Sequence, residues 1–202
     1  MIERSCVLMR RSGTAGRPGG ARGASGFTLI ELMVTLAIGV LLMVVAVPSL
    51  MQFRKNADLS DAVSSFVMAT SAAKSAALKT GRNTYLVPTD TTVGWRSGWF
   101  VYVDENFNGL QDGTEQKIAE HGALTADITV TTPAPNSGTV PSTLRATPAY
   151  LMYSGSGFPR QTSGVLAMGI IVMQTSVRTS AVIVDTTGRA RSCKPDPTTC
   201  AF

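Results

Sequence analysis

The carboxylate of Glu31 is the only charged side chain between Phe27 and Phe53, a stretch that is otherwise apolar or neutral. A charged side chain near the centre of a bilayer costs roughly 2.5–3.5 kcal/mol on insertion scales, so a lone acid in such a stretch indicates a function. Cleavage after Gly26 would give Phe27 a new ammonium group, four residues before Glu31. Opposite charges attract far more strongly in a low-dielectric setting than in water. The spacing therefore predicts that Glu31 pairs with the amino terminus of a neighbouring copy of the chain.

This junction resembles the processing signal of type IV pilins and type II secretion pseudopilins, which is carried here by Gly26-Phe27-Thr28-Leu29-Ile30-Glu31. The resemblance implies that a prepilin peptidase cleaves after Gly26 and methylates Phe27. It also implies that the chain contacts the membrane, an inner-membrane assembly platform, and other pilins or pseudopilins in a filament. An ordinary transmembrane anchor or a secretory signal peptide predicts neither the Gly-Phe pair nor an acid inside the apolar run.

The leader, residues 1–26, is expected to be removed, and it is strongly basic. Five arginines against one glutamate give it +4 of the chain's formal charge of +5. Basic residues before an apolar run stay in the cytoplasm. The sequence therefore predicts a single-pass protein of the bacterial inner membrane with a periplasmic globular part, and the resemblance implies extrusion into a pilus or pseudopilus.

One helix over residues 28–80 is predicted from two successive patterns. Residues 27–53 form a stretch that is long and apolar enough to cross about 30 Å of hydrocarbon, and they are predicted to be the transmembrane and filament-core half of the helix. Pro48 lacks a backbone donor and is expected to kink this half. Residues 54–80 are amphipathic, and Gly81 is a stop signal. The apolar positions of the second half recur at helical spacing: Leu59, Ala62, Val63, Phe66, Ala69, Ala73, Ala76 and Ala77.

Residues 81–202 change to short apolar or β-branched runs separated by turn signals, which predicts strands. The expected fold class is therefore α+β and pilin-like, with the long helix packed on an antiparallel sheet. Residues 133–148 are rich in Pro, Ser and Thr and are predicted to form a loop. The predicted strands are Thr84–Val87, Trp99–Val103, Gln116–Glu120, Ile128–Thr132, Tyr150–Tyr153, Val165–Met173 and Ala181–Asp185, with a short final strand that includes Arg189 and Arg191.

A block around two tryptophans narrows the resemblance to the GspH/FimT family, and it consists of Gly94-Trp95, Gly98–Asp104, Asn106, Asn108-Gly109, Asp112 and Glu115. The resemblance implies a minor pilin that is a structural and priming subunit of type IV pilus assembly. The alternative is an H-type pseudopilin of a type II secretion system. Arginines and cysteines near the carboxyl terminus favour the minor pilin. The 133–148 loop is the clearest departure from the family.

Five oxygen-bearing side chains after the second predicted strand fit the calcium-loop pattern of EF-hands, with the required glycine at Gly109. These side chains are Asp104, Asn106, Asn108, Asp112 and Glu115. Strands rather than helices are predicted on both sides of the loop. The competing interpretation is a β-hairpin whose Asp and Asn side chains hydrogen-bond the turn. No other cofactor is expected.

A Gly188-Arg189-x-Arg191 motif near the carboxyl terminus predicts a patch for phosphate groups, because guanidinium forks suit phosphate oxygens. Lys194 is close in sequence, and Arg178 and Arg160 can join only through folding. Residues 136–202 hold six Lys/Arg against two Asp, whereas residues 81–135 hold three against seven acids. The motif also resembles that of FimT-like minor pilins that bind double-stranded DNA during natural transformation. The alternatives are solvated arginines or a salt bridge to the acidic hairpin.

Two cysteines, Cys193 and Cys200, remain after the leader and its Cys6 are removed. An isolated pair in an oxidising compartment predicts a disulfide. A two-cysteine metal site is the alternative, and it lacks a nearby histidine or third cysteine.

Catalysis finds little support in the sequence, and we expect that the protein is not an enzyme. His121 is the only histidine. The Ser154-Gly155-Ser156-Gly157 run is not a nucleophile elbow. There is no phosphate-loop or dinucleotide-binding fingerprint.

Overall fold

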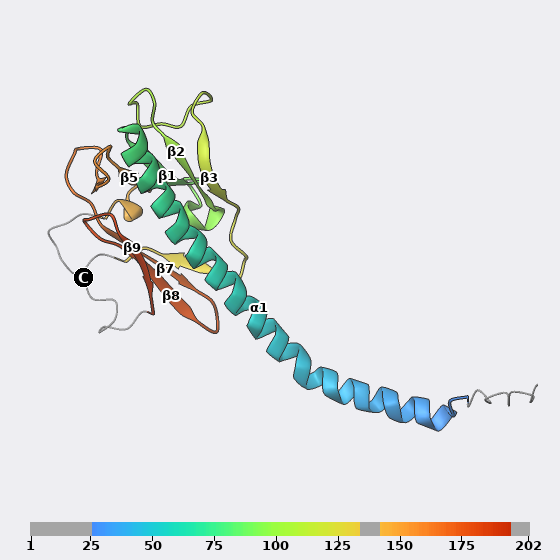
Figure 1. Cartoon of the computed structure of the whole chain (residues 1–202). Coiled ribbons are helices and arrows are strands. Elements are labelled where there is room, and N and C mark those ends of the chain that lie inside the picture. The colour runs from blue at the N-terminus through green and yellow to red at the C-terminus, as the bar shows by residue number, and fades with distance from the viewer. Residues whose placement is uncertain (1–25, 134–141, 195–202) are drawn as a thin grey trace, which may run out of the picture. The chain divides into compact units, whose positions relative to one another are not determined.

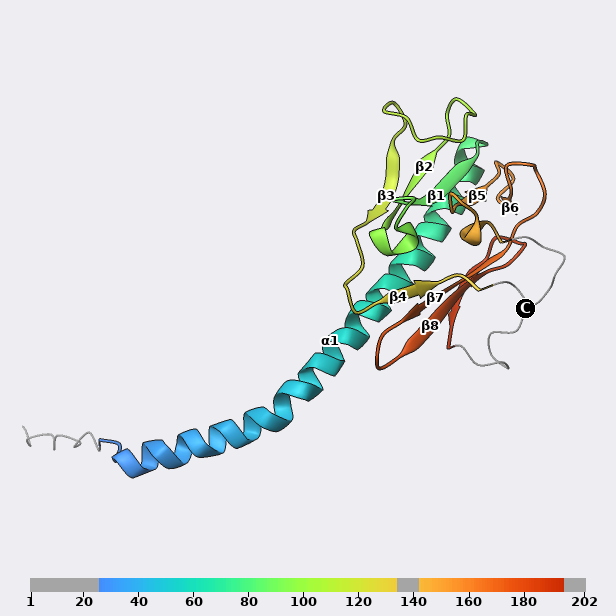
Figure 2. The same ribbon diagram turned by 180° about the vertical axis from the view of Figure 1, so that it is seen from behind.

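The computed structural model describes residues 26–133 and 142–194 of the 202-residue chain. It contains one long helix, α1 (Leu29–Thr80), followed by two antiparallel sheets (Figures 1 and 2). The chain forms two compact units, which divide between Val44 and Val45, inside α1. Both sheets and the later turns of α1 belong to the second unit.

The described part of the first unit is the start of α1 with the three residues before it. Its large apolar side chains are exposed, among them Leu36 at 62% and Leu41 at 69%. The most apolar window of α1 has a mean hydropathy of 2.7, and the helix is long and apolar enough to cross a membrane. A helix that is apolar all round needs lipid or other apolar helices around it.

Pro48 lies inside α1, near the start of the second unit. Proline has no backbone N–H, so the carbonyl of Val44 lacks its usual helical donor. The helix continues through this position to Thr80, because its later turns are stabilised by tertiary packing. The kink expected at Pro48 stays a prediction.

The first sheet, called sheet A, has five strands in the order β3-β2-β1-β5-β6, and all its pairings are antiparallel. The second, sheet B, has four strands in the order β4-β7-β8-β9, also antiparallel. Two short 3₁₀ helices interrupt the connections, η1 (Gly94–Ser97) and η2 (Thr143–Arg145). The strands are β1 (Thr84–Pro88), β2 (Trp99–Val103), β3 (Lys117–His121), β4 (Thr129–Thr131), β5 (Leu151–Tyr153), β6 (Pro159–Arg160), β7 (Gly169–Gln174), β8 (Thr179–Val184) and β9 (Ala190–Cys193).

The α+β fold is confirmed, and four details of the prediction are wrong. The expected strand Val165–Met173 begins only at Gly169, and the last strand begins at Ala190, so Arg189 belongs to the preceding turn. Residues 142–148, predicted as loop, contain η2, whose Leu144 is fully buried. The strands form two sheets rather than one, because a strand's partner is decided by long-range packing and not by its own alternation.

The core lies between α1 and the helix-facing sides of both sheets (Figures 1 and 2). Small residues of α1, including the fully buried Ala73 and Ala77, let the strands approach the helix closely. Phe66, also fully buried, packs edge-to-face on Trp95 at 5.4 Å and on Trp99 at 5.2 Å between ring centroids. The helix is therefore attached to the strands by one aromatic cluster and a stripe of alanines.

Candidate functional site

Gly26 and Phe27, the residues of the predicted cleavage and methylation site, precede the helix. Thr28 caps the helix, because its Oγ1 accepts a hydrogen bond of 3.3 Å from the backbone N–H of Glu31. These two residues occupy the first and last places of a Thr-x-x-Glu capping box. This role of Thr28 was not predicted, although the Ser/Thr-x-x-Glu spacing before an apolar run signals it.

Glu31 lies in the first turn of α1, and its side chain is exposed. A negative charge in the first turn interacts favourably with the helix dipole. Within residues 26–133 and 142–194 its carboxylate makes no hydrogen bond or ion pair. The helix cap therefore holds a carboxylate close to the predicted cleavage point and leaves its oxygens available to another chain.

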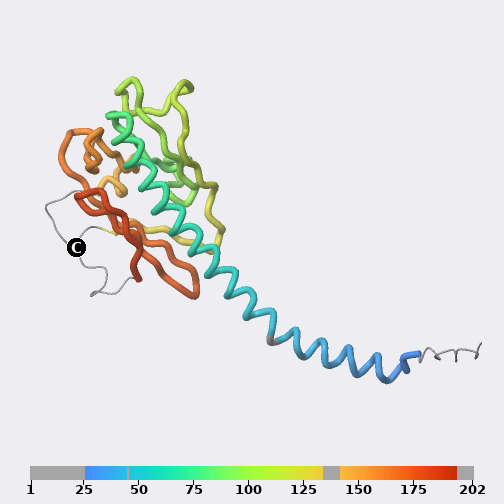
Figure 3. The backbone as a smooth tube through the Cα atoms, in the orientation of Figure 1, coloured from blue at the N-terminus to red at the C-terminus, as the bar shows by residue number. Residues whose placement is uncertain are grey.

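The β2–β3 loop brings the five predicted calcium residues together at the end of sheet A, next to the carboxyl end of α1 (Figure 3). Asp104 is 1% exposed, and its two carboxylate oxygens accept backbone N–H groups of Asn108 at 3.1 Å and Gly109 at 3.0 Å. The side-chain amides of Asn106 and Asn108 both donate to Asp112 Oδ2, at 2.6 and 3.2 Å. The loop thus has the turn-bonding network that the hairpin interpretation predicted.

Ionisation in this loop follows from its hydrogen bonds and its burial. Side-chain hydrogen bonds from Thr114 and Asn106 hold the pKa of the Asp112 carboxyl below its usual value. Burial raises the pKa of the Tyr102 hydroxyl, and Tyr85, Asp104, Glu115 and Asp112 raise it further by their charges. The Tyr102 hydroxyl donates to the carbonyl of Gly109 at 3.2 Å, so it stays protonated as a structural donor beneath the loop.

The predicted DNA-binding residues do not form one patch. Arg178 and Lys194 line a pocket with Ser60 of α1, and the guanidinium of Arg178 donates to Ser60 Oγ at 3.3 Å. Arg191 pairs across β9 and β8 with Ile183, which lies in a cluster separate from the helix-facing core. Cross-strand partners share a face of the sheet. Arg191 therefore lies on the face away from α1, and it is exposed.

Arg160 lies apart from the other predicted DNA-binding residues, because it belongs to β6 of sheet A. Its guanidinium donates to the carbonyl of Gly164 at 2.5 Å. Only its charge linked it to Arg189 and Arg191 in the sequence. A two-residue strand such as β6 has too short a pattern to be recognised, so its sheet could not be foreseen. Arg189 is exposed at the β8–β9 turn, which leaves Arg189 and Arg191 as the exposed pair of the motif.

Gly188 has a backbone reason to be glycine in the Gly-Arg-x-Arg motif. Its φ is +78°, and an added Cβ would lie 2.7 Å from Tyr153 Cε1 and 2.8 Å from the Gly157 carbonyl oxygen. Partial burial raises the pKa of the neighbouring Asp185, but hydrogen bonds from Thr187 and Arg189 outweigh it and lower the pKa overall. The turn that contains Arg189 is therefore stabilised by hydrogen bonds to the Asp185 carboxylate within the turn itself.

The remaining predicted residues have packing roles or lie outside the described chain. His121 stacks on Trp99 at 4.4 Å, and its Nε2 lies 3.6 Å from Asp61 Oδ2. Cys193 ends β9 and packs beside the Ile170 cluster. Cys200 lies outside the described residues, so the disulfide stays a prediction. In the described part of the chain, no three His, Cys, Asp or Glu residues are grouped to hold a metal.

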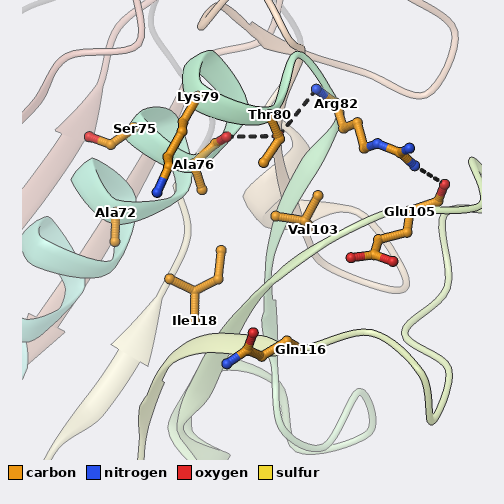
Figure 4. Close-up of a pocket in the computed structure, with 10 residues that line it drawn as sticks. All are labelled: Ala72, Ser75, Ala76, Lys79, Thr80, Arg82, Val103, Glu105, Gln116 and Ile118. Atoms are coloured by element: carbon orange, nitrogen blue, oxygen red, sulfur yellow. Dashed lines mark hydrogen bonds between the residues drawn. The ribbon is translucent and has the colours of Figure 1, made fainter.

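An open pocket of about 620 Å³ lies between the end of α1 and strands β2 and β3 (Figure 4). Ala72, Ala76 and Ile118 give it apolar walls, and Figure 4 shows Arg82 reaching from the end of α1 to the Glu105 carbonyl. This pocket is a groove beside the edge strand β3.

Comparisons with known proteins agree with these observations. Residues 62–188 match the family described as type II transport protein GspH, and residues 21–47 match the prokaryotic N-terminal methylation motif. No curated protein matches the sequence. Together the motif, the apolar helix and the α+β unit define a pilin-like subunit. The chain belongs to the GspH family, whose members are structural pilins and pseudopilins.

Two solved structures resemble the fold at low sequence identity. The type IV minor pilin FimU of Pseudomonas aeruginosa is 12% identical with a TM-score of 0.48, over 69% of this chain and 90% of that one. The minor pseudopilin EpsH of the Vibrio cholerae type 2 secretion system is 14% identical with a TM-score of 0.46, over 68% of this chain and 98% of that one.

Proposed function

We propose that this protein is a minor type IV pilin, a structural subunit that helps to prime the assembly of the fibre. The observation that carries its role as a filament subunit is the start of α1, where Thr28 caps a helix whose first turn holds Glu31. The exposed Arg189 and Arg191 favour the pilin over the pseudopilin. The apolar side chains that follow are exposed over the whole described first unit. Such a surface is stabilised first by lipid and then by the apolar helices of other subunits.

The proposed mechanism begins in the inner membrane, with the globular unit in the periplasm. A prepilin peptidase cleaves after Gly26, which creates the ammonium group of Phe27. The Glu31 carboxylate of one subunit then attracts the ammonium group of the next in a low-dielectric setting. The apolar helices bundle as an assembly platform drives the subunits outward.

Deletion of the gene is expected to reduce surface pili and natural transformation strongly and to leave secretion of folded proteins unchanged. Pili are counted by electron microscopy, and secretion is measured as enzyme activity in the medium of the same strains. Complementation with the intact gene is the control. Loss of secretion with normal piliation would contradict the proposal.

The second candidate is an H-type pseudopilin in the periplasmic pseudopilus of a type II secretion system. It is favoured by the match to a family described as a type II transport protein. Both functions use the same cleavage site, the same Glu31 pairing and the same helix bundle. The deletion experiment distinguishes the two functions because one system assembles surface pili and the other secretes folded proteins.

We also propose that the pilin binds double-stranded DNA through Arg189 and Arg191. Both side chains are exposed, one at the turn before the edge strand β9 and one within it. Five of the seven acids of residues 81–135 lie in the β2–β3 hairpin of sheet A, whereas Arg191 lies in β9 of sheet B and Arg189 in the turn before it. Binding by counterion release needs no reading of bases, so it suits a subunit that takes up any sequence.

Replacing Arg189 and Arg191 together by Gln is expected to weaken DNA binding about tenfold or more and to reduce the salt slope by about 2. The measurement is fluorescence anisotropy with duplex DNA at several salt concentrations. A matched control removes two other exposed arginines, Arg96 and Arg145, by the same change. Equal loss in both double variants, or no loss in the first, would refute a specific role for the motif.

A further inference from the structure

The β2–β3 loop contains a buried carboxylate oxygen whose hydrogen-bonding capacity is not used. Glu115 is 5% exposed, and its Oε1 accepts a hydrogen bond of 2.8 Å from the backbone N–H of Glu105. Its Oε2 is buried and has no hydrogen-bond partner among the described residues. A buried acceptor without a partner is costly, and the cost is larger for a charged group. The loop therefore has a strong acceptor that the described residues leave unsatisfied.

We propose that this loop binds one calcium ion through Asp104, Asn106, Asn108 and Glu115, with Asp112 acting directly or through water. Glu115 stands at the twelfth place of the loop, where calcium loops use a glutamate with both oxygens. Its bond to the backbone N–H of Glu105 places the carboxylate at the start of the loop, next to the residue that follows Asp104 in the sequence. The orphaned Oε2 is then the second oxygen that such a glutamate supplies.

The other side chains of the loop already converge. Asn106 and Asn108 meet at Asp112 Oδ2, which joins the third, fifth and ninth places of the pattern. The oxygens Asn106 Oδ1 and Asn108 Oδ1 accept backbone N–H groups two residues ahead, of Asn108 at 3.1 Å and Leu110 at 2.7 Å. An amide oxygen has two lone pairs, so each can accept such a bond and contact a cation as well.

Calcium suits this loop better than other metals because every donor is oxygen. Hard cations take carboxylate, amide and backbone carbonyl oxygens, whereas zinc and copper prefer histidine and cysteine. No three His, Cys, Asp or Glu residues are grouped to hold a metal in the described part of the chain, so the calcium ion would also need the asparagine and backbone oxygens that calcium loops use. The flanking strands β2 and β3 take the place of the usual helices, since all the ligands come from the loop itself.

The test uses the processed full-length protein, purified in detergent and freed of metal with a chelator. Terbium is added first, because its luminescence is excited through a nearby tyrosine and Tyr102 contacts the loop. Calcium is expected to displace it with a Kd in about the 10⁻⁴–10⁻³ M range of extracellular calcium modules. About 10 mM calcium should also raise the melting temperature by about 5 °C, and magnesium at the same concentration should raise it much less.

Glu115→Gln removes the second anionic oxygen with little change of shape and is expected to weaken calcium binding about tenfold or more. Because this residue is buried, Asp112→Asn provides a second variant at a half-buried position. Asp90→Asn is the matched control, since Asp90 also caps an exposed turn, by accepting from Thr92, and lies outside the loop. Absence of terbium luminescence and of a calcium-dependent melting shift in the unmodified protein would overturn the proposal, as would unchanged binding in both loop variants.

Discussion

Glu31→Val is expected to leave membrane insertion intact and to reduce incorporation into the filament about a hundredfold. Removing one partner of a buried ion pair typically costs 3–5 kcal/mol, roughly, because the other charge is left unpaired. The unpaired charge would be the ammonium group of Phe27 on the neighbouring subunit. Valine at this depth makes insertion itself easier. The measurement is the ratio of the protein in sheared filaments to that in membranes, determined by immunoblot.

Two further variants separate the ion pair from the helix cap. Glu31→Gln retains a side chain suited to the capping box but removes the charge, so it should assemble as poorly as the valine variant. Thr28→Ala removes the hydroxyl that accepts from Glu31 N–H and keeps the charge. It should cost about 1 kcal/mol of helix stability and leave most incorporation intact. The opposite ranking would show that Glu31 acts as a cap and not as an ion-pair partner.

Phe66→Ala is expected to lower the free energy of unfolding of the globular unit by about 3–5 kcal/mol, the usual cost of removing a buried phenylalanine. Phe66 is fully buried and contacts the rings of Trp95 and Trp99 edge-to-face. The deletion leaves a cavity where helix and strands meet. Urea unfolding followed by tryptophan fluorescence measures the effect directly, because these are the two tryptophans of the chain.

Met68→Ala on the same helix is the control for this prediction. Met68 is 70% exposed, so its truncation should change the unfolding free energy by less than about 0.5 kcal/mol. Equal effects of the two variants would mean that α1 does not dock on the sheets through Phe66.

The long helix was predictable because its evidence is local. An apolar run, a following stripe at helical spacing and Gly81 at the end together identify a helix that the structure gives as Leu29–Thr80. Strands such as β2, with the same bounds in prediction and structure, were equally clear from turn residues on both sides. The start of β7 at Gly169 could not be predicted in this way, because residues 165–168 are apolar enough to extend the strand pattern. The strand starts at Gly169 because its pairing with β8 starts there.

The candidate sites likewise divide into those set by local sequence and those set by long-range contacts. Gly26, Phe27 and Glu31 lie within six residues, so their chemistry follows from spacing alone. The arginines are distributed over a longer part of the chain, and the folded unit separates Arg160 in sheet A from Arg191 in sheet B.

By itself, the sequence determined the processing junction, the apolar helix and the oxygen-rich pattern of the β2–β3 loop, because each is set by neighbours along the chain. Only the tertiary structure decided which basic residues share a surface and that Glu115 is buried with one oxygen unpartnered. Burial and strand partnership depend on contacts between residues far apart in sequence, and the free energy of such contacts is not contained in any local pattern.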